Sequence, residues 1–266
     1  MNKNTSHHSD LLILQELEKL AAALGNWRDH VVLGGGVALL VYGQLMSEEK
    51  VEPLGTSDMD WLIPRKPLMK GKSDSISEIL ESCGYSYRSK GPGTPPVSSY
   101  IKEVEDQEIE VEFLTDNKSR EKLGDSVTIQ KAEVTAQPLS YLEMSLDETT
   151  VATLKNGIEI RVVTPEAWVF HKGLTFNRRP KKSSKYLKDL YGIWFVLTQM
   201  GDLSVAAGLN LKKLQKKYSP NWADDFSKNL HAWVDQATPK EWDQLVQQDP
   251  RGELSKVIFR SLIDRL

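Results

Sequence analysis

The stretch "VVLGGGVALLVYGQLMSEEKVEPLGTSDMDWLIP", residues 31–64, decides what fold we expect. An apolar run enters three consecutive glycines, and the "VALLVYGQL" that follows is typical of a buried helix. Further on, "SDMDWLIP" alternates polar and apolar residues like a strand that ends at Pro64. The stretch predicts a strand, a tight glycine turn, a helix and a second strand, on which Asp58 and Asp60 share one face.

The glycines and the two aspartates suggest related chemistry. Glycines between a strand and a helix let the backbone approach an anion closely, and the helix N-terminus adds partial positive charge. The motif is neither a P-loop nor a dinucleotide-binding fingerprint. Two neighbouring carboxylates such as Asp58 and Asp60 repel each other unless a cation neutralises them, and Mg²⁺ completed by substrate phosphates is a common solution. A solvated strand end with two unrelated acids is the alternative.

A third carboxylate is available on a later segment. The sequence "EIEVEFL", residues 108–114, alternates strictly, so that its glutamates share one face and its apolar side chains the other. Charged edge strands also resist aggregation, which is a competing explanation for the glutamates. If one of them faces the aspartates, the site can hold two metal ions for displacement at phosphorus.

The flanking segments predict the rest of the architecture. Residues 10–24 have the apolar spacing of a helix that stops at Gly25, and "SISEILESCGY" predicts another helix. The Gly- and Pro-rich "SKGPGTPPVSSY" predicts a loop or a hairpin connection. Residues 149–163 predict a hairpin with a primed turn at Asn156-Gly157.

The character of the chain changes at Thr164, which caps a helix that begins with Pro165. Strand patterns almost vanish beyond that point. We therefore expect a mixed-sheet α/β lobe over residues 1–164 and a helical lobe over residues 165–266.

Composition excludes several classes of protein. The 266 residues are 39% hydrophobic and 27% charged, with a net charge of −3, which is ordinary for a globular protein and gives no global signal for nucleic acid or membrane binding. The single cysteine, Cys83, excludes an internal disulfide framework and indicates a reducing compartment. The polar N-terminus lacks the apolar core of a signal peptide, and no apolar run is long enough to span a bilayer, so we expect a cytoplasmic protein.

Taken together, "LGGGVALLVYG", "TSDMDWLI" and "VEFLTD" resemble the nucleotidyltransferase superfamily, which has a polymerase-beta-like fold. The resemblance implies a triphosphate held at Gly35 and Gly36, and Mg²⁺ held by Asp58, Asp60 and a third carboxylate. Glu112, between Val111 and Phe113, best matches that third position, and Glu110 is the alternative.

The later segment "TPEAWVFHKGLTFNRRPKKSSKYLKDLYGIWFVL" is similar to the helical lobe of bacterial minimal nucleotidyltransferases related to AbiEii-type toxins. That likeness implies that Lys172 contacts nucleotide phosphates and that Asp189 completes the site beside Lys188. The basic segment 177–188, which includes Arg178, favours a phosphate or RNA backbone contact, although a solvated loop explains it equally.

The sequence thus leads to the hypothesis of a Mg²⁺-dependent nucleotidyltransferase that uses an NTP and releases pyrophosphate. Its acceptor hydroxyl belongs to RNA or tRNA if the protein is toxin-like, in which case an antitoxin protein is a possible partner. An acidic pocket built from Glu103, Glu105, Asp106 and Glu108 favours instead a polycationic small molecule, such as an aminoglycoside. A non-catalytic nucleotide-binding protein is the alternative from a different class.

Overall fold

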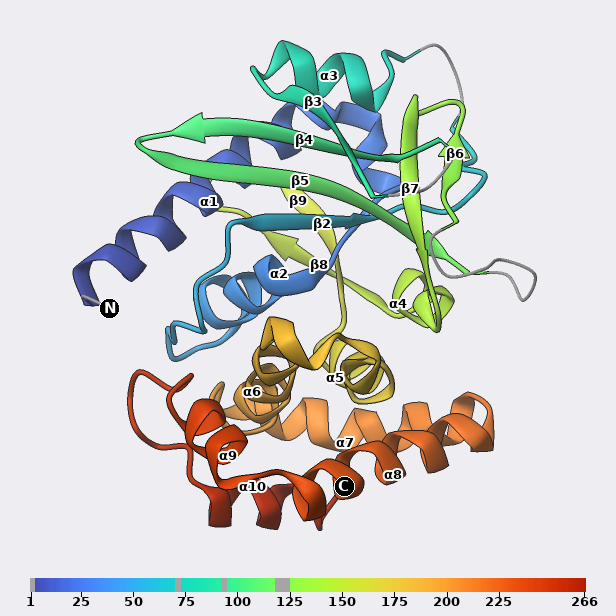
Figure 1. The fold of residues 1–266 in the computed structure, drawn as a ribbon. Helices are drawn as coiled ribbons and strands as arrows, with labels where there is room; N and C mark the ends of the chain where they lie inside the picture. Colours follow the sequence, from blue (N-terminus) through green and yellow to red (C-terminus); the bar gives the residue numbers. More distant parts are fainter. Residues whose placement is uncertain (1–2, 70–72, 92–94, 118–124) are drawn as a thin grey trace. The chain divides into compact units, whose positions relative to one another are not determined.

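The computed structural model describes residues 3–69, 73–91, 95–117 and 125–266. The chain divides into two compact units. The first comprises residues 1–41 and 55–164 and contains the sheet; the second comprises residues 42–54 and 165–266 and is helical (Figure 1). The predicted mixed α/β fold is confirmed.

Within the described residues, the strands of the first unit form a mixed sheet in the order β3-β4-β5-β2-β1-β9-β8, with β7 beside β5 and β6 beside β7. β2 is parallel to β5 and antiparallel to β1, and β1 is parallel to β9. The strands are β1 (Val32–Leu33), β2 (Asp58–Leu62), β3 (Ser86–Lys90), β4 (Val97–Val104), β5 (Gln107–Asp116), β6 (Val127–Ile129), β7 (Val134–Leu139), β8 (Thr149–Thr153) and β9 (Glu159–Val163).

Two helices, α1 (Lys3–Leu24) and α3 (Ile76–Ser82), cover one face of this sheet (Figure 1). Apolar side chains of both helices and of β2 and β5 surround one small interior gap; they include Leu20, Leu24, Trp61, Ile76, Leu80 and Phe113. α1 begins seven residues before the predicted start, and Gly25, with a φ of 51°, follows its end as predicted. The alternation of β5 is confirmed, because every second residue from Ile109 to Thr115 is buried.

The hairpin of β8 and β9 is confirmed, but its turn differs from the prediction. The Leu154 N–H donates to the Ile158 carbonyl oxygen, which leaves a three-residue loop, and the Gly157 N–H donates to the Leu154 carbonyl oxygen. Of Asn156 and Gly157, only Gly157 has a positive φ, 82°. This geometry is a type I turn followed by one left-handed residue, rather than the primed two-residue turn that Asn-Gly predicts.

The predicted connection "SKGPGTPPVSSY" joins two antiparallel strands, β3 and β4, although residues 92–94 lie outside the described residues. The helix after the glycines is α2 (Gly35–Val41), which continues as a π-helical turn over Tyr42–Met46. A short helix, α4 (Leu142–Asp147), precedes β8.

The second unit is helical, as the loss of strand patterns predicts. Trp233, Trp242 and Phe259 form one aromatic cluster, and Gly173 packs so closely on Phe226 that a Cβ would overlap the ring. Its longer helices are α5 (Pro165–Thr175), α6 (Lys185–Thr198), α7 (Asp202–Lys217), α8 (Pro220–Gln236), α9 (Pro239–Val246) and α10 (Lys256–Ile263). Among the described residues, no single helix has the length and apolarity to cross a bilayer, although the bent pair α6–α7 passes that test jointly.

Candidate active site

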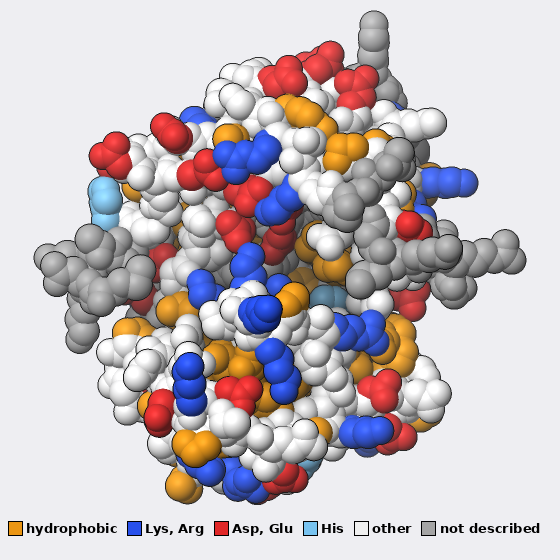
Figure 2. All heavy atoms as spheres, in the orientation of Figure 1, with side chains coloured by type: hydrophobic (Ala, Val, Ile, Leu, Met, Phe, Trp, Pro, Cys, Tyr) orange, Lys and Arg blue, Asp and Glu red, His pale blue; other side chains and the backbone are white. Residues whose placement is uncertain are grey.

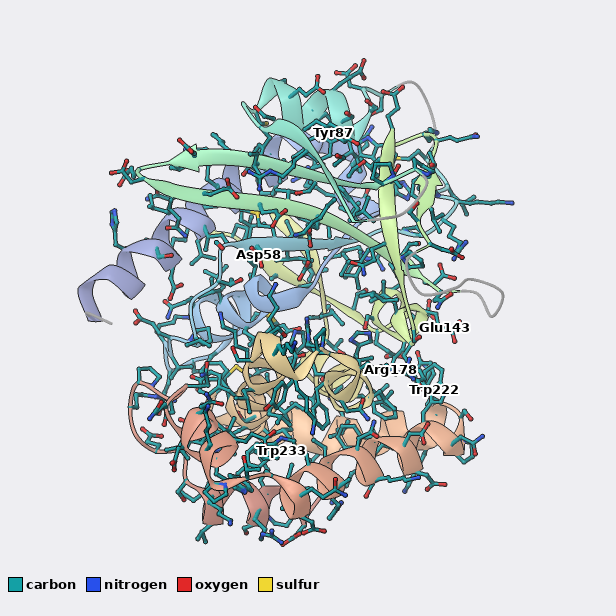
Figure 3. All side chains as sticks on the ribbon, in the orientation of Figure 1. Asp58, Tyr87, Glu143, Arg178, Trp222 and Trp233 are labelled. Atoms are coloured by element: carbon teal, nitrogen blue, oxygen red, sulfur yellow. The ribbon has the colours of Figure 1, made fainter. Side chains whose placement is uncertain are left out.

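Four carboxylates share one face of the sheet. In the parallel pairing of β2 with β5, Asp58 lies beside Glu110 and Asp60 lies beside Glu112. Since side chains of paired residues point the same way, these four form a single surface, which we call the acidic face. Figure 3 labels Asp58 at the start of β2, and Figure 2 shows acidic side chains gathered on the first unit.

The glycine turn lies directly against this face. The Gly34 N–H donates to the backbone carbonyl oxygen of Asp60 at 2.8 Å, which ties the turn to the middle of β2. Gly35 has a φ of 58°, a conformation that costs other residues about 1–2 kcal/mol. A Cβ on Gly35 would also overlap the Asp60 carboxylate. Only glycine allows both the bend and this close approach.

The glycines on either side of Gly35 are constrained as well. A Cβ on Gly34 would overlap the side chain of Leu62, and a Cβ on Gly36 would come within 2.8 Å of the Thr56 hydroxyl oxygen. The three glycines pack against Leu62 and Asp60 of β2 and against Thr56, which lies just before the strand. Close packing against the strand that carries the two aspartates therefore explains the run of three glycines.

The entry to β2 orients the first aspartate. The Asp58 N–H donates to the Thr56 hydroxyl at 3.3 Å, and the Ser57 hydroxyl donates to the Asp58 carboxylate at 3.2 Å. The backbone of Ser57 is fixed in turn, because its carbonyl oxygen accepts the Glu110 N–H at 3.1 Å. These local bonds hold Asp58 on the acidic face where the strand begins.

A lysine from the edge strand occupies the other side of the acidic face. Lys90 of β3 places its ammonium 3.0 Å from Glu110, and it also forms an ion pair with Glu112. The Ser99 hydroxyl of β4 donates a second hydrogen bond to Glu110. Glu110 therefore has two partners, Ser99 on the adjacent strand β4 and Lys90 on β3 beyond it, whereas Lys90 is the partner that the structure gives Glu112.

These contacts perturb the ionisation of the cluster. Burial opposes the charge of Glu110, but the bonds from Ser99 and Lys90 outweigh it and hold the pKa of this carboxyl below its ordinary value. Burial likewise opposes the charge of Lys90, and its contacts with Glu112 and Glu110 raise the pKa of the ammonium above the ordinary value. Both partners are therefore charged at neutral pH.

The donor set fits a hard divalent cation. Carboxylate oxygens are the ligands that Mg²⁺ and similar ions prefer, and the acidic face offers four carboxylates on adjacent strands. Within the part of the chain that the structure describes, no group of three or more His, Cys, Asp or Glu side chains is placed so that it could hold a metal ion, so binding requires these carboxylates to reorient. The Lys90 ammonium shows that a cation is accommodated here, because it bridges two of the four carboxylates.

In the second unit, Lys172 Nζ lies 3.0 Å from Asp189 Oδ1. Arg179 forms a second ion pair with the same carboxylate. Lys188 and Arg178 are exposed. In α6, Lys188 lies between two buried residues, Leu187 and Asp189. The functional roles of these residues remain predictions.

The four acids considered for a polycation pocket lie around the hairpin that joins β4 to β5. Glu105 and Asp106 form its turn with positive φ values of 49° and 65°, and Glu103 pairs across the strands with Glu108. Two of the four already have partners, since Glu105 contacts a histidine and Glu108 forms a bidentate ion pair with Arg88.

Sequence reasoning missed Lys90 and Ser99 as members of the acidic face, and it placed Arg179 in the basic segment without pairing it with Asp189. One signal was present: Arg88 and Lys90 alternate on a strand just as the glutamates of β5 do. Their pairing with particular glutamates depends on the β3-β4-β5 register, which the sequence does not fix.

Comparison with known proteins agrees with this geometry. A family model described as "Nucleotidyltransferase" matches residues 14–206, and the chain belongs to this family. No curated protein matches the chain significantly.

Two solved structures are similar to the chain at low identity. One is an antigenic nucleotidyltransferase-like protein from Paracoccidioides brasiliensis, 14% identical over 79% of this chain and 92% of that one, with a TM-score of 0.34. The other is the antibiotic-resistance factor ANT(2'')-Ia, 14% identical over 78% of this chain and 97% of that one, with a TM-score of 0.39. At these TM-scores, neither structure informs the choice of substrate.

Proposed function

We propose that the chain transfers a nucleoside monophosphate from an NTP to an acceptor hydroxyl, with Mg²⁺ as cofactor. One observation carries this proposal: the parallel register that sets Asp60 beside Glu112, directly against the Gly35 turn. A family match alone does not require active carboxylates. Acids on two strands next to a glycine-lined bend supply what phosphoryl transfer needs, namely metal ligands and backbone that a triphosphate can approach.

Each part of the site has a distinct role in this proposal. Asp58, Asp60 and Glu112 would hold the ion, which supplies charge neutralisation at the α-phosphorus. Gly35 and Gly36 would let the triphosphate approach the backbone N–H groups at the start of α2, since neither residue carries a side chain. The acceptor oxygen forms a bond to the α-phosphorus. The bond between the α-phosphorus and the oxygen that bridges it to the β-phosphate breaks, and pyrophosphate leaves. The acceptor's proton passes to a base, for which Glu112 is the candidate.

The contacts of the two glutamates support Glu112 over Glu110 as the third carboxylate. Glu110 pairs with Asp58 at the start of β2, and it is held by both Ser99 and Lys90. Glu112 pairs with Asp60, the aspartate that touches the glycine turn. A ligand must be able to reorient toward the ion, and Glu112 has fewer bonds to break.

RNA or tRNA is the acceptor that the surface of the second unit favours. Arg178, Lys181, Lys182, Lys185 and Lys188 lie within twelve residues of chain, and all five are exposed. Such a cluster attracts a phosphate backbone through counterion release. A toxin-like protein of the AbiEii type, with an antitoxin partner, is the biological role consistent with this acceptor.

Labelling tests the proposal directly. The protein is incubated with each α-³²P-labelled NTP, Mg²⁺ and total RNA, and in parallel with an aminoglycoside in place of RNA. We expect label in RNA and release of pyrophosphate, with both lost in an Asp58→Asn variant. Labelled aminoglycoside would show that the acceptor is a small molecule rather than RNA, and the proposed nucleotidyl transfer would stand. NTP binding without any pyrophosphate release would overturn the enzymatic function.

A further inference from the structure

The Lys90 ammonium lies where a metal ion would have to compete with it. It contacts both Glu110 and Glu112, and these two carboxylates pair with the two aspartates of β2. Arg88, two residues earlier on the same face of β3, pairs with Glu108 instead. Of these two cations on the edge strand, Lys90 is the one directed at the acidic face.

We propose that Lys90 is a tethered counterion, which partly neutralises the acidic face in the metal-free protein and is displaced from Glu112 when a divalent ion binds. This inference rests on the proposed function, because it concerns the same carboxylates. Lys90 is thus a positioning residue that sets how tightly the ion is held.

Electrostatics explains why such a residue is needed. Four carboxylates on adjacent strands repel one another, and part of that repulsion opposes the pairing of β2 with β5. The side chains of Glu110 and Glu112 are only 14% and 17% exposed, so water screens them incompletely. A cation supplied by the chain itself removes much of this repulsion before any ion arrives.

The geometry also permits release. The Lys90 side chain is 48% exposed, and its strand lies at the edge of the sheet, so the ammonium can move into solvent without breaking a strand pairing. Glu110 keeps its bond from Ser99 when Lys90 leaves, because that hydroxyl belongs to the neighbouring strand β4. The cluster can therefore exchange its tethered cation for a divalent one while the sheet stays intact.

Mn²⁺ affinity tests the inference, measured by calorimetry on the full chain in the absence of nucleotide. Lys90→Met removes the competing charge, and Lys90→Arg keeps it. Arg88→Met is the matched control, since it removes a cation from the same face of the same strand but spares Glu110 and Glu112.

We expect Lys90→Met to bind Mn²⁺ about three- to ten-fold more tightly than the wild type, as one partly screened charge is removed next to the ion. Lys90→Arg should remain near the wild-type affinity, and Arg88→Met should stay within about two-fold of it because its charge is farther away and screened. In metal-free buffer Lys90→Met should also melt at a lower temperature, and Mn²⁺ should recover that loss.

If Lys90 only supports the fold, its loss should disorder the carboxylates and weaken Mn²⁺ binding. Where the wild type binds Mn²⁺ and Lys90→Met binds it equally or more weakly, the inference is overturned. If neither the wild type nor Lys90→Met binds Mn²⁺, the inference and the proposed metal site fail together.

Discussion

The two faces of strands β2 and β5 have different roles, although residues of the two faces alternate along each strand. On one face, Trp61 and Phe113 are buried against α1 and α3. On the other, Asp60 and Glu112 stand beside each other next to the glycine turn. A one-residue slip of either strand would exchange the two faces, so a single register secures both the core and the site.

The faces also use ion pairs differently. On the core side, Glu16 of α1 is buried and accepts bonds from Lys102 of β4 and from Lys19, each at 2.7 Å. That pairing fixes a helix to the sheet. On the acidic face, Lys90 is half exposed and lies on an edge strand, and its partners are the carboxylates of the site. A buried pair holds the fold, whereas a half-exposed pair can be exchanged.

The largest expected change in stability distinguishes Phe113 from its neighbour Glu112. Phe113→Ala should destabilise the protein by about 4 kcal/mol, because it removes a buried ring from the core. Glu112→Gln should leave stability within about 0.5 kcal/mol and yet abolish transfer, because it touches only the acidic face. Urea unfolding and an NTP turnover assay on both variants check this division. Comparable unfolding losses in the two variants would contradict it.

The next effect concerns Glu16 and carries a pH dependence. Burial opposes the charge of Glu16, but the bonds from Lys102 and Lys19 outweigh it and lower its pKa below the ordinary value of 4.5. The unfolded chain therefore binds the proton more readily, so the stabilisation is complete above about pH 4.5 and is lost as the pH falls through the folded-state pKa.

Glu16→Gln should accordingly cost about 3 kcal/mol at neutral pH, since it removes the buried charge that pairs with the partly buried Lys102. The difference in unfolding free energy between the wild type and the variant should shrink below pH 4.5. Chemical denaturation at several pH values measures it. A difference that stays constant with pH would show that this ion pair does not contribute as described.

A smaller loss of stability than those of Phe113→Ala and Glu16→Gln is expected at the glycine turn. Gly35→Ala should cost about 1–2 kcal/mol because of its positive φ, and it should also displace the Asp60 carboxylate and reduce activity strongly. Gly157→Ala is the matched control: its φ is also positive, but a Cβ there meets nothing within 4 Å. Equal activity in the two variants would mean that the contact between Gly35 and Asp60 is unimportant.

Local patterns predicted much of the fold and the composition of the site. The alternation of residues 108–114 showed which side chains would face the core, and the paired aspartates were placed on the same face by the period of a strand. These inferences succeed because each needs only a local periodicity.

Features that depend on pairing between distant segments were not predictable in the same way. Nothing local shows that Gly35 meets Asp60, or that Lys90 reaches two glutamates across an intervening strand. The membership of residues 42–54 in the second unit is another such feature. The Asn156-Gly157 turn shows that even a strong local signal yields to hairpin register.

Metal-dependent pyrophosphate release by the wild type and by Asp60→Asn tests the central claim, that carboxylates of β2 and β5 hold one catalytic ion. We predict release by the wild type only when Mg²⁺ or Mn²⁺ is present, and a loss of about 10³-fold or more in Asp60→Asn with unchanged or slightly higher stability. Release by Asp60→Asn at the wild-type rate, or release by the wild type in EDTA, would contradict the claim.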